Sequence, residues 1–105
     1  MRSMHLKKKR IYMDLNNIAV IYGSDSSEWE VSVKSGEFTA SQIDAERFDV
    51  YEVFARFGKW VVKAYRLKGQ ERVIIPEEER PEICKTDFSA VVAGAKVKFD
   101  YAYIM

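Results

Sequence analysis

The stretch Asn16–Phe38, NNIAVIYGSDSSEWEVSVKSGEF, decides how this sequence is expected to fold. Ile18 to Tyr22 is an apolar run without a polar face, which is typical of a strand buried on both sides in a parallel sheet. Gly23 and a turn rich in serine and aspartate follow directly. Nucleotide-binding α/β domains begin in a similar way, but the further glycines that let a backbone wrap a diphosphate are absent. The turn is therefore expected to hold something other than phosphate.

The segment after this turn fits two structures. Residues 28–33, EWEVSV, alternate between polar and apolar side chains, and the following KSGE could form a turn, which together favour a hairpin. Against this, Ser27 and Glu30 have the spacing of a helix capping box. Val31 and Phe38 also lie seven residues apart on one helical face, with Ser35 between them. The pattern alone does not decide between strand and helix.

The rest of the chain reads mainly as strands. Runs rich in β-branched and aromatic residues are separated by turns at Gly58-Lys59 and at Lys68–Gln70. We expect strands over 47–55, 60–67 and 71–76, the first two forming an antiparallel hairpin, then a charged loop over 77–81 and a final strand over 96–105 that becomes central in the sheet. The predicted fold class is therefore α/β with a mixed sheet. Since one helix cannot cover both faces of such a sheet, the sequence reads as the first piece of something longer.

Size and charge restrict the classes of partner. The chain has 105 residues, which suit one domain, and its 17 basic and 16 acidic residues give a net charge of +1. The net charge therefore gives no electrostatic indication of nucleic-acid binding. The longest uninterrupted apolar run, Ile18 to Tyr22, is far shorter than the roughly 20 residues of a membrane helix. A single cysteine, Cys84, excludes an internal disulfide and, without a secretory signal, favours the cytoplasm.

The first 15 residues are expected to form a separate basic arm. Lys7–Arg10 is the only block of like charges, and a solvated arm is favoured over contact with nucleic acid or anionic lipid. The only histidine, His5, lies in the same arm, so a histidine-based catalytic pair or metal site cannot be assembled within this chain. Cys84 is expected to be an inert thiol, because charged neighbours flank it on one side only.

From Asn16 onward the sequence resembles the N-terminal domain of the D-alanine–D-alanine ligases, ATP-grasp enzymes of peptidoglycan synthesis. That family has an apolar strand, a glycine pair, the string Ser-x-Glu-x-x-Val-Ser and a pair of small residues. The matching positions here are Gly23, Ser26, Glu28, Val31, Ser32, Ser35 and Gly36. Gly58-Lys59-Trp60 is similar to the family's Gly-x-Trp turn, and the last twenty residues look like the version found in Bacteroides-type bacteria. Ser24 replaces the second glycine of the pair, so the turn is expected to permit a positive φ less readily.

The resemblance covers residues 16–105 and implies a Rossmann-like pre-ATP-grasp domain. It resolves the ambiguous segment as one main helix over about 27–43, with Trp29 and Val33 to the side of the core face. The family continues with Ile-His-Gly and a glycine-rich loop, so the chain is expected to stop before the ATP-grasp domain, after about a third of a complete ligase.

The same resemblance supplies the candidate site. Glu28 corresponds to the family glutamate that binds the amino group of the first D-alanine, and is the predicted catalytic and substrate-binding residue. A carboxylate in the first turn of a helix is favoured by the helix dipole, and it suits an ammonium group. Val31 is expected to line the pocket for the substrate methyl group, and Gly23 to let the backbone come close. Without the resemblance, Glu28 reads as ordinary charge at a helix N-terminus.

The implied reaction joins two D-alanines and converts ATP to ADP and phosphate, with Mg (or Mn), for cell wall synthesis. The resemblance also implies a homodimer. Because the ATP-binding and metal-binding parts are not found in residues 1–105, the chain alone is expected to bind no cofactor and to be inactive. Two alternatives stay open at this point: D-lactate in place of the second D-alanine, and a stand-alone α/β module that binds a small ligand without catalysis.

Overall fold

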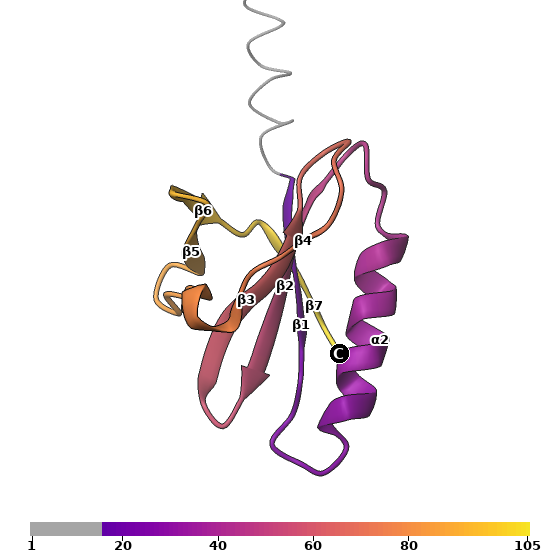
Figure 1. Ribbon diagram of the computed structural model, residues 1–105, viewed down its shortest axis with the longest axis vertical. Helices are drawn as coiled ribbons and strands as arrows, with labels where there is room; N and C mark the ends of the chain where they lie inside the picture. The colour runs from indigo at the N-terminus through magenta and orange to yellow at the C-terminus, as the bar shows by residue number, and fades with distance from the viewer. Residues whose placement is uncertain (1–15) are drawn as a thin grey trace, which may run out of the picture.

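The computed structural model describes residues 16–105. The predicted basic arm, 1–15, lies outside the described residues, and so do Lys7–Arg10 and His5. A five-stranded mixed sheet forms the centre of the molecule, with strand order β4-β3-β2-β1-β7 (Figure 1). Its strands are β1 (Asn17–Tyr22), β2 (Asp49–Arg56), β3 (Lys59–Arg66), β4 (Val73–Ile74) and β7 (Tyr101–Ile104). The predicted α/β class with a mixed sheet is confirmed.

The strand directions follow from the connections. β1 pairs in parallel with β2 and with β7, whereas β3 is antiparallel to both β2 and β4. The predicted hairpin, β2–β3, turns at Phe57 and Gly58, whose φ values are 54° and 79°. Two successive positive φ values are what a tight two-residue hairpin turn requires. The predicted hairpin is therefore confirmed, and its turn lies one residue earlier than expected.

One helix, α2 (Trp29–Gln42), covers the face of the sheet formed by β1 and β2 (Figure 1). Its buried residues are Gly36 and Ala40, and Val33 packs against the cluster beneath them. Val31 and Phe38 instead lie on the outer face, 60% and 66% exposed. The helix is confirmed, and its two small buried residues let it approach the sheet closely. The expectation that Val33 lies beside the core face is wrong, whereas Trp29 is not among the side chains that pack against this cluster.

The helix begins without the predicted capping box. Its N-cap residue is Glu28 rather than Ser27, and no side-chain hydrogen bond caps it. Instead the Ser26 hydroxyl accepts a hydrogen bond from Glu28 N at 3.1 Å, just before the first turn. The serines of the turn therefore order the chain before the helix rather than its first turn.

The other face of the sheet is covered by a hairpin that was not predicted from the sequence. β5 (Ser89–Val92) and β6 (Ala95–Lys98) form a separate two-stranded hairpin. A large core of buried side chains joins this segment to the sheet: Ala19, Ile21, Tyr51, Val53, Val62, Ile83, Ala90, Val92 and Phe99. Both faces of β1 and β2 are thus covered, one by a helix and the other by a hairpin with its flanking chain.

The final predicted strand, 96–105, is two strands. Phe99 is buried in the core and Asp100 bonds to Asn17, its N donating to Asn17 O at 2.8 Å and its Oδ2 accepting from Asn17 N at 2.8 Å. These contacts break the alternation and direct β7 into the main sheet. Among the described strands β7 lies at an edge, so the predicted central position is wrong.

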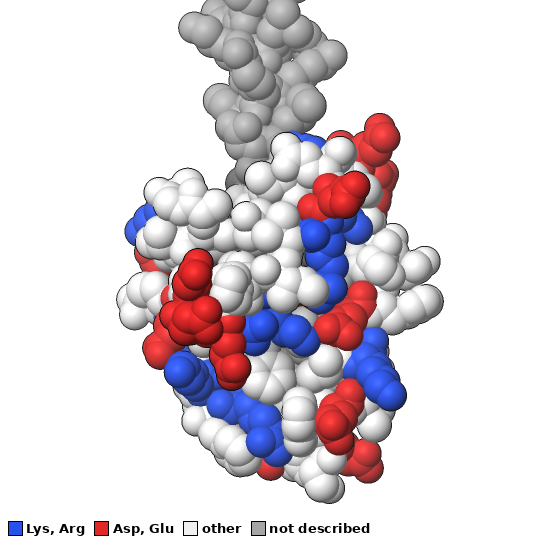
Figure 2. All heavy atoms as spheres, viewed as in Figure 1, with Lys and Arg blue, Asp and Glu red and all other residues white. Residues whose placement is uncertain are grey.

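Two other predictions need smaller corrections. The predicted strand 71–76 is reduced to the two residues of β4, at the other edge of the sheet. Within the predicted charged loop, Glu77–Glu79 form one turn of 3-10 helix, η1. Acidic and basic side chains are interspersed on the face shown in Figure 2. In the described part of the chain, no helix is long and apolar enough to cross a membrane.

Candidate functional site

The loop of residues 23–28 leaves the carboxyl end of β1 and leads into α2 (Figure 1). In open α/β sheets, ligands bind beyond the carboxyl ends of the parallel strands. Arg56 Nε, at the end of β2, donates a hydrogen bond to Ser24 O at 2.8 Å. Asp25 Oδ1 accepts a hydrogen bond from Phe57 N, in the hairpin turn. The loop is therefore fixed to the β2–β3 hairpin at two points.

Ser32 connects the loop to the first turns of α2. Its Oγ accepts a hydrogen bond from Gly23 N at 3.0 Å and donates to Gly23 O at 3.1 Å. The same hydroxyl lies 3.5 Å from the carbonyl oxygen of Met105, which follows β7. One half-buried side chain thus brings together the carboxyl ends of two parallel strands and the start of the helix.

The Ser32 contact gives a direct prediction. Replacing Ser32 with alanine removes two short hydrogen bonds, and each such bond contributes about 1 kcal/mol to stability. We expect Ser32→Ala to lower the free energy of unfolding by about 1–2 kcal/mol in urea titrations, since alanine's better helix propensity offsets only part of the loss. Ser35→Ala, an exposed position of the same helix, is the control and should stabilise slightly. Equal effects of the two changes would contradict this function of Ser32.

Glu28 is exposed at the N-cap of α2. Its backbone is engaged, since its carbonyl oxygen accepts hydrogen bonds from Val31 N and Ser32 N at 3.1 and 3.2 Å. Its carboxylate makes no hydrogen bond or ion pair with any residue in 16–105. A negative charge is favoured beside the free N–H groups of a helix start, and this carboxylate is open to solvent.

The other two predicted site residues lie nearby with different surroundings. Val31 is in the first turn, on the outer face of the helix, and is 60% exposed. Gly23 has a φ of 108°, and a Cβ built on it would lie 2.4 Å from Ala55 O. The absence of a side chain at Gly23 is thus required by β2 itself. Ser24 is not among the described non-glycine residues with positive φ, so serine replaces the second glycine of the family pair without strain.

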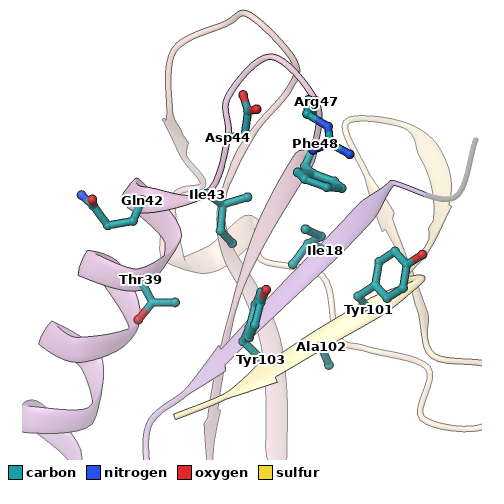
Figure 3. A pocket seen from close by; sticks show the side chains of 10 residues that line it. All are labelled: Ile18, Thr39, Gln42, Ile43, Asp44, Arg47, Phe48, Tyr101, Ala102 and Tyr103. Carbon is teal, nitrogen blue, oxygen red and sulfur yellow. The ribbon is translucent and has the colours of Figure 1, made fainter. Parts of the chain in front are cut away.

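A groove of about 880 Å3 lies at the opposite end of the sheet (Figure 3). It opens between the end of α2 and β7, because the helix leaves this side of β7 uncovered. The lining residues are Ile18, Thr39, Gln42, Ile43, Asp44, Arg47, Phe48, Tyr101, Ala102 and Tyr103. None of them was predicted to be a site residue. Its position at the amino end of β1 separates it from the loop of residues 23–28.

Comparison with known proteins identifies the relatives of this chain. The D-alanine–D-alanine ligase of Phocaeicola vulgatus is 36% identical over 87 residues, which are 83% of this chain and 24% of the ligase. The ligase of Parabacteroides distasonis is 35% identical over 88 residues, or 84% of this chain and 23% of the ligase. The chain is related to the D-alanine–D-alanine ligases. No protein-family model matches the sequence.

The resemblance seen in the sequence is thereby confirmed, including its Bacteroides-type character. A third D-alanine–D-alanine ligase, from Bacteroides thetaiotaomicron, is 31% identical over 87 residues. The chain spans about a quarter of the length of these curated relatives. Because the relatives are named as ligases, the comparisons do not favour a binding module without catalysis.

The residues present do not fit the metal ion that the ligase name implies. In the described range, 16–105, no three His, Cys, Asp or Glu side chains come together to hold a metal ion. The two acids at the helix start, Glu28 and Glu30, do not form such a group, and Mg2+ is usually bound by carboxylates together with phosphates and several waters. The loop of residues 23–28 therefore presents the carboxylate of Glu28 without a protein partner in the described range.

Proposed function

We propose that this chain is the N-terminal substrate-binding part of a D-alanine–D-alanine ligase, in which residues 16–105 form the domain. The complete enzyme joins two D-alanines for cell wall synthesis in the cytoplasm, and acts as a homodimer. ATP and Mg (or Mn), held by other parts of the enzyme, supply the phosphoryl group that activates the first D-alanine. The observation that carries the proposal is a free carboxylate, Glu28, at the helix start in a chain related to these ligases.

Glu28 would bind the ammonium group of the first D-alanine. Its exposed carboxylate lies beyond the carboxyl end of β1, where a ligand of an α/β sheet is expected. Holding the ammonium group fixes the direction of the substrate carboxylate, so the contribution of Glu28 is mainly one of orientation. Val31, three residues later and exposed, would contact the methyl group. Gly23 keeps the backbone of the loop close to β2 and so shapes this wall.

The first experiment is to read the gene past the codon for Met105 and to assay the complete product. We expect the frame to continue into the rest of a ligase, and the purified product to release ADP and phosphate only when D-alanine is present. A complete product without D-alanine-dependent phosphate release would overturn the proposal.

The Glu28 assignment has its own test in the complete enzyme. Glu28→Gln removes the charge but keeps the shape, so we expect the apparent KM for the first D-alanine to rise about 10- to 100-fold, as for a lost hydrogen bond to a charged group. Glu30→Gln is the matched control, because Glu30 is an exposed acid in the same first turn. It should change this KM less than about twofold. Equal effects of the two variants would show that only the charge near the helix start matters.

A further inference from the structure

A polar network centred on the buried carboxylate of Glu52 lies between α2 and the sheet. Glu52, in the middle of β2, is only 3% exposed. Its Oε1 accepts a hydrogen bond from the Tyr22 hydroxyl at 2.9 Å. Arg72 binds both of its carboxylate oxygens, with Nε to Oε2 at 2.7 Å and Nη2 to Oε1 at 2.9 Å. Buried charges persist in folded proteins when they are paired and hydrogen-bonded in this way.

The same network reaches the helix. Glu37 of α2 forms an ion pair with Lys63 of β3 at 2.9 Å and lies 3.5 Å from Arg72 Nη2. Tyr22, Glu37, Glu52, Lys63 and Arg72 are called the Glu52 network below. It connects α2 with β1, β2, β3 and the chain before β4. Burial, followed by the charge of Glu52, raises the pKa of Tyr22 well above its ordinary value, so its hydroxyl stays a donor.

Hydrophobic burial alone does not specify which face of α2 packs on the sheet. The packed face is formed mainly by small residues, Gly36 and Ala40. The opposite face carries Val31 and Phe38, which are larger apolar side chains and mostly exposed. At 100° per residue the two faces lie on opposite sides of the helix. Because the hydrophobic effect is non-directional, it would favour burial of either face.

The Glu52 network distinguishes the two orientations. Glu37 lies at the flank of the packed face and reaches Lys63 and Arg72 only when Gly36 and Ala40 face the sheet. In the rotated helix the partners of Glu37 would be lost. In some proteins, polar contacts around a buried charge such as that of Glu52 select one arrangement rather than add stability.

The orientation of α2 also fixes the candidate site. Tyr22 belongs to the network and directly precedes Gly23, while Ser32 ties Gly23 to the helix. A rotation of α2 would displace Glu28 and Val31, because both belong to its first turn or its cap. We propose that the Glu52 network positions Glu28 and Val31 for the first D-alanine by holding α2 in one orientation on the sheet. The effect of the network on D-alanine binding rests on the proposed function, whereas its effect on the orientation of α2 does not.

The kinetic test uses the complete gene product. Glu52→Gln keeps the shape of the buried side chain and removes its charge. We expect it to raise the KM for the first D-alanine about tenfold while kcat and the KM for ATP stay within about twofold. In a Glu28→Gln background the same change should raise this KM less than about twofold, because the carboxylate that the network positions is already lost. The control is Asp87→Asn, which breaks the ion pair between Asp87 and Lys96 of β6.

A second measurement does not depend on activity. Amide hydrogen exchange of the same variants reports local opening segment by segment. In Glu52→Gln we expect exchange about tenfold faster in peptides covering 23–42 and unchanged exchange in the β5–β6 hairpin. Glu37→Gln, a change at a partly exposed position, should accelerate the same peptides to a smaller degree.

The outcomes separate the two proposals. Faster exchange in 23–42 without any D-alanine-dependent activity of the complete product would support the account of the helix and overturn the proposed function. Faster exchange with an unchanged KM would overturn the link between the network and the substrate. If neither exchange nor KM differs from Asp87→Asn, the positioning inference is wrong.

Discussion

Replacing Gly36 with alanine is expected to destabilise the protein by about 2–3 kcal/mol, the cost of overpacking a tight contact. Helix propensity predicts the opposite sign, since alanine in a helix is favoured over glycine by about 1 kcal/mol. The contact decides the outcome, because a Cβ on Gly36 would lie 2.1 Å from Tyr22 Cδ2 and 2.6 Å from Tyr22 Cβ. A rotation of the tyrosine ring cannot relieve the second contact, since Cβ is fixed by the backbone. The helix must therefore move away from β1.

Thermal or urea unfolding of the 105-residue chain measures this effect. For a domain of this size, a loss of 2–3 kcal/mol corresponds to a decrease in Tm of roughly 10–20 °C. Ser35→Ala is the matched control, because Ser35 is the preceding residue of the same helix and is exposed. It should leave Tm unchanged or raise it slightly. A Gly36→Ala variant as stable as Ser35→Ala would contradict the close packing of α2 on Tyr22.

Gly36 also explains why the sequence misled about the packed face of the helix. Val31 and Phe38, seven residues apart, suggest an apolar stripe, whereas Gly36 and Ala40 contribute little apolar surface to any pattern. The large side chain in the contact belongs to Tyr22 of β1, so the complementary residue lies in another element. A periodicity in one segment cannot show that a bulky neighbour needs a small partner. The helix therefore packs on the sheet with the face that is less apolar in the sequence.

The strands show a similar division. Ile18–Tyr22 and the hairpin around Gly58 could be predicted because their local patterns agree with their positions in the sheet. The break at Phe99-Asp100 could not, since it depends on contacts of Asp100 with Asn17, more than eighty residues earlier. For the β5–β6 hairpin the local signal in the sequence is Gly94. In the structure Ala93 and Gly94 have φ values of 52° and 81°, which suit a two-residue turn.

The candidate site depended on the resemblance rather than on the pattern. From spacing alone, Glu28 was interpreted as an ordinary charged residue at a helix N-terminus. Its exposed carboxylate in the structure agrees both with that interpretation and with a substrate-binding residue. The supporting contacts of the loop could not be predicted, because Arg56 and Phe57 come from a hairpin thirty residues away. Glu52 did carry a signal, as an acid between apolar residues inside the strand sequence DVYEVFA, but its partners Tyr22 and Arg72 lie in other segments.

Gly23→Ala is expected to have the largest effect on the candidate site. The φ of 108° at Gly23 is rarely adopted by other residues, which costs about 1–3 kcal/mol. In addition, a Cβ there would lie 2.4 Å from Ala55 O, a backbone atom of β2 that is held in the sheet. We expect a loss of about 3 kcal/mol or more in the free energy of unfolding, near the upper end for single substitutions.

Gly58→Ala separates the two causes of this loss. Gly58 also has a positive φ, 79°, but no atom lies within 4 Å of a Cβ built there. It should therefore show the backbone cost alone, about 1 kcal/mol. The difference between the two variants measures the contact of Gly23 with β2.

If both variants unfold at the same urea concentration, Gly23 is needed only for its φ, and the close approach of the loop to Ala55 does not stabilise the site. If Gly23→Ala is much less stable than Gly58→Ala, the loop lies against β2 because no side chain fits between them. The family's glycine at this position then has a structural cause that is independent of any substrate.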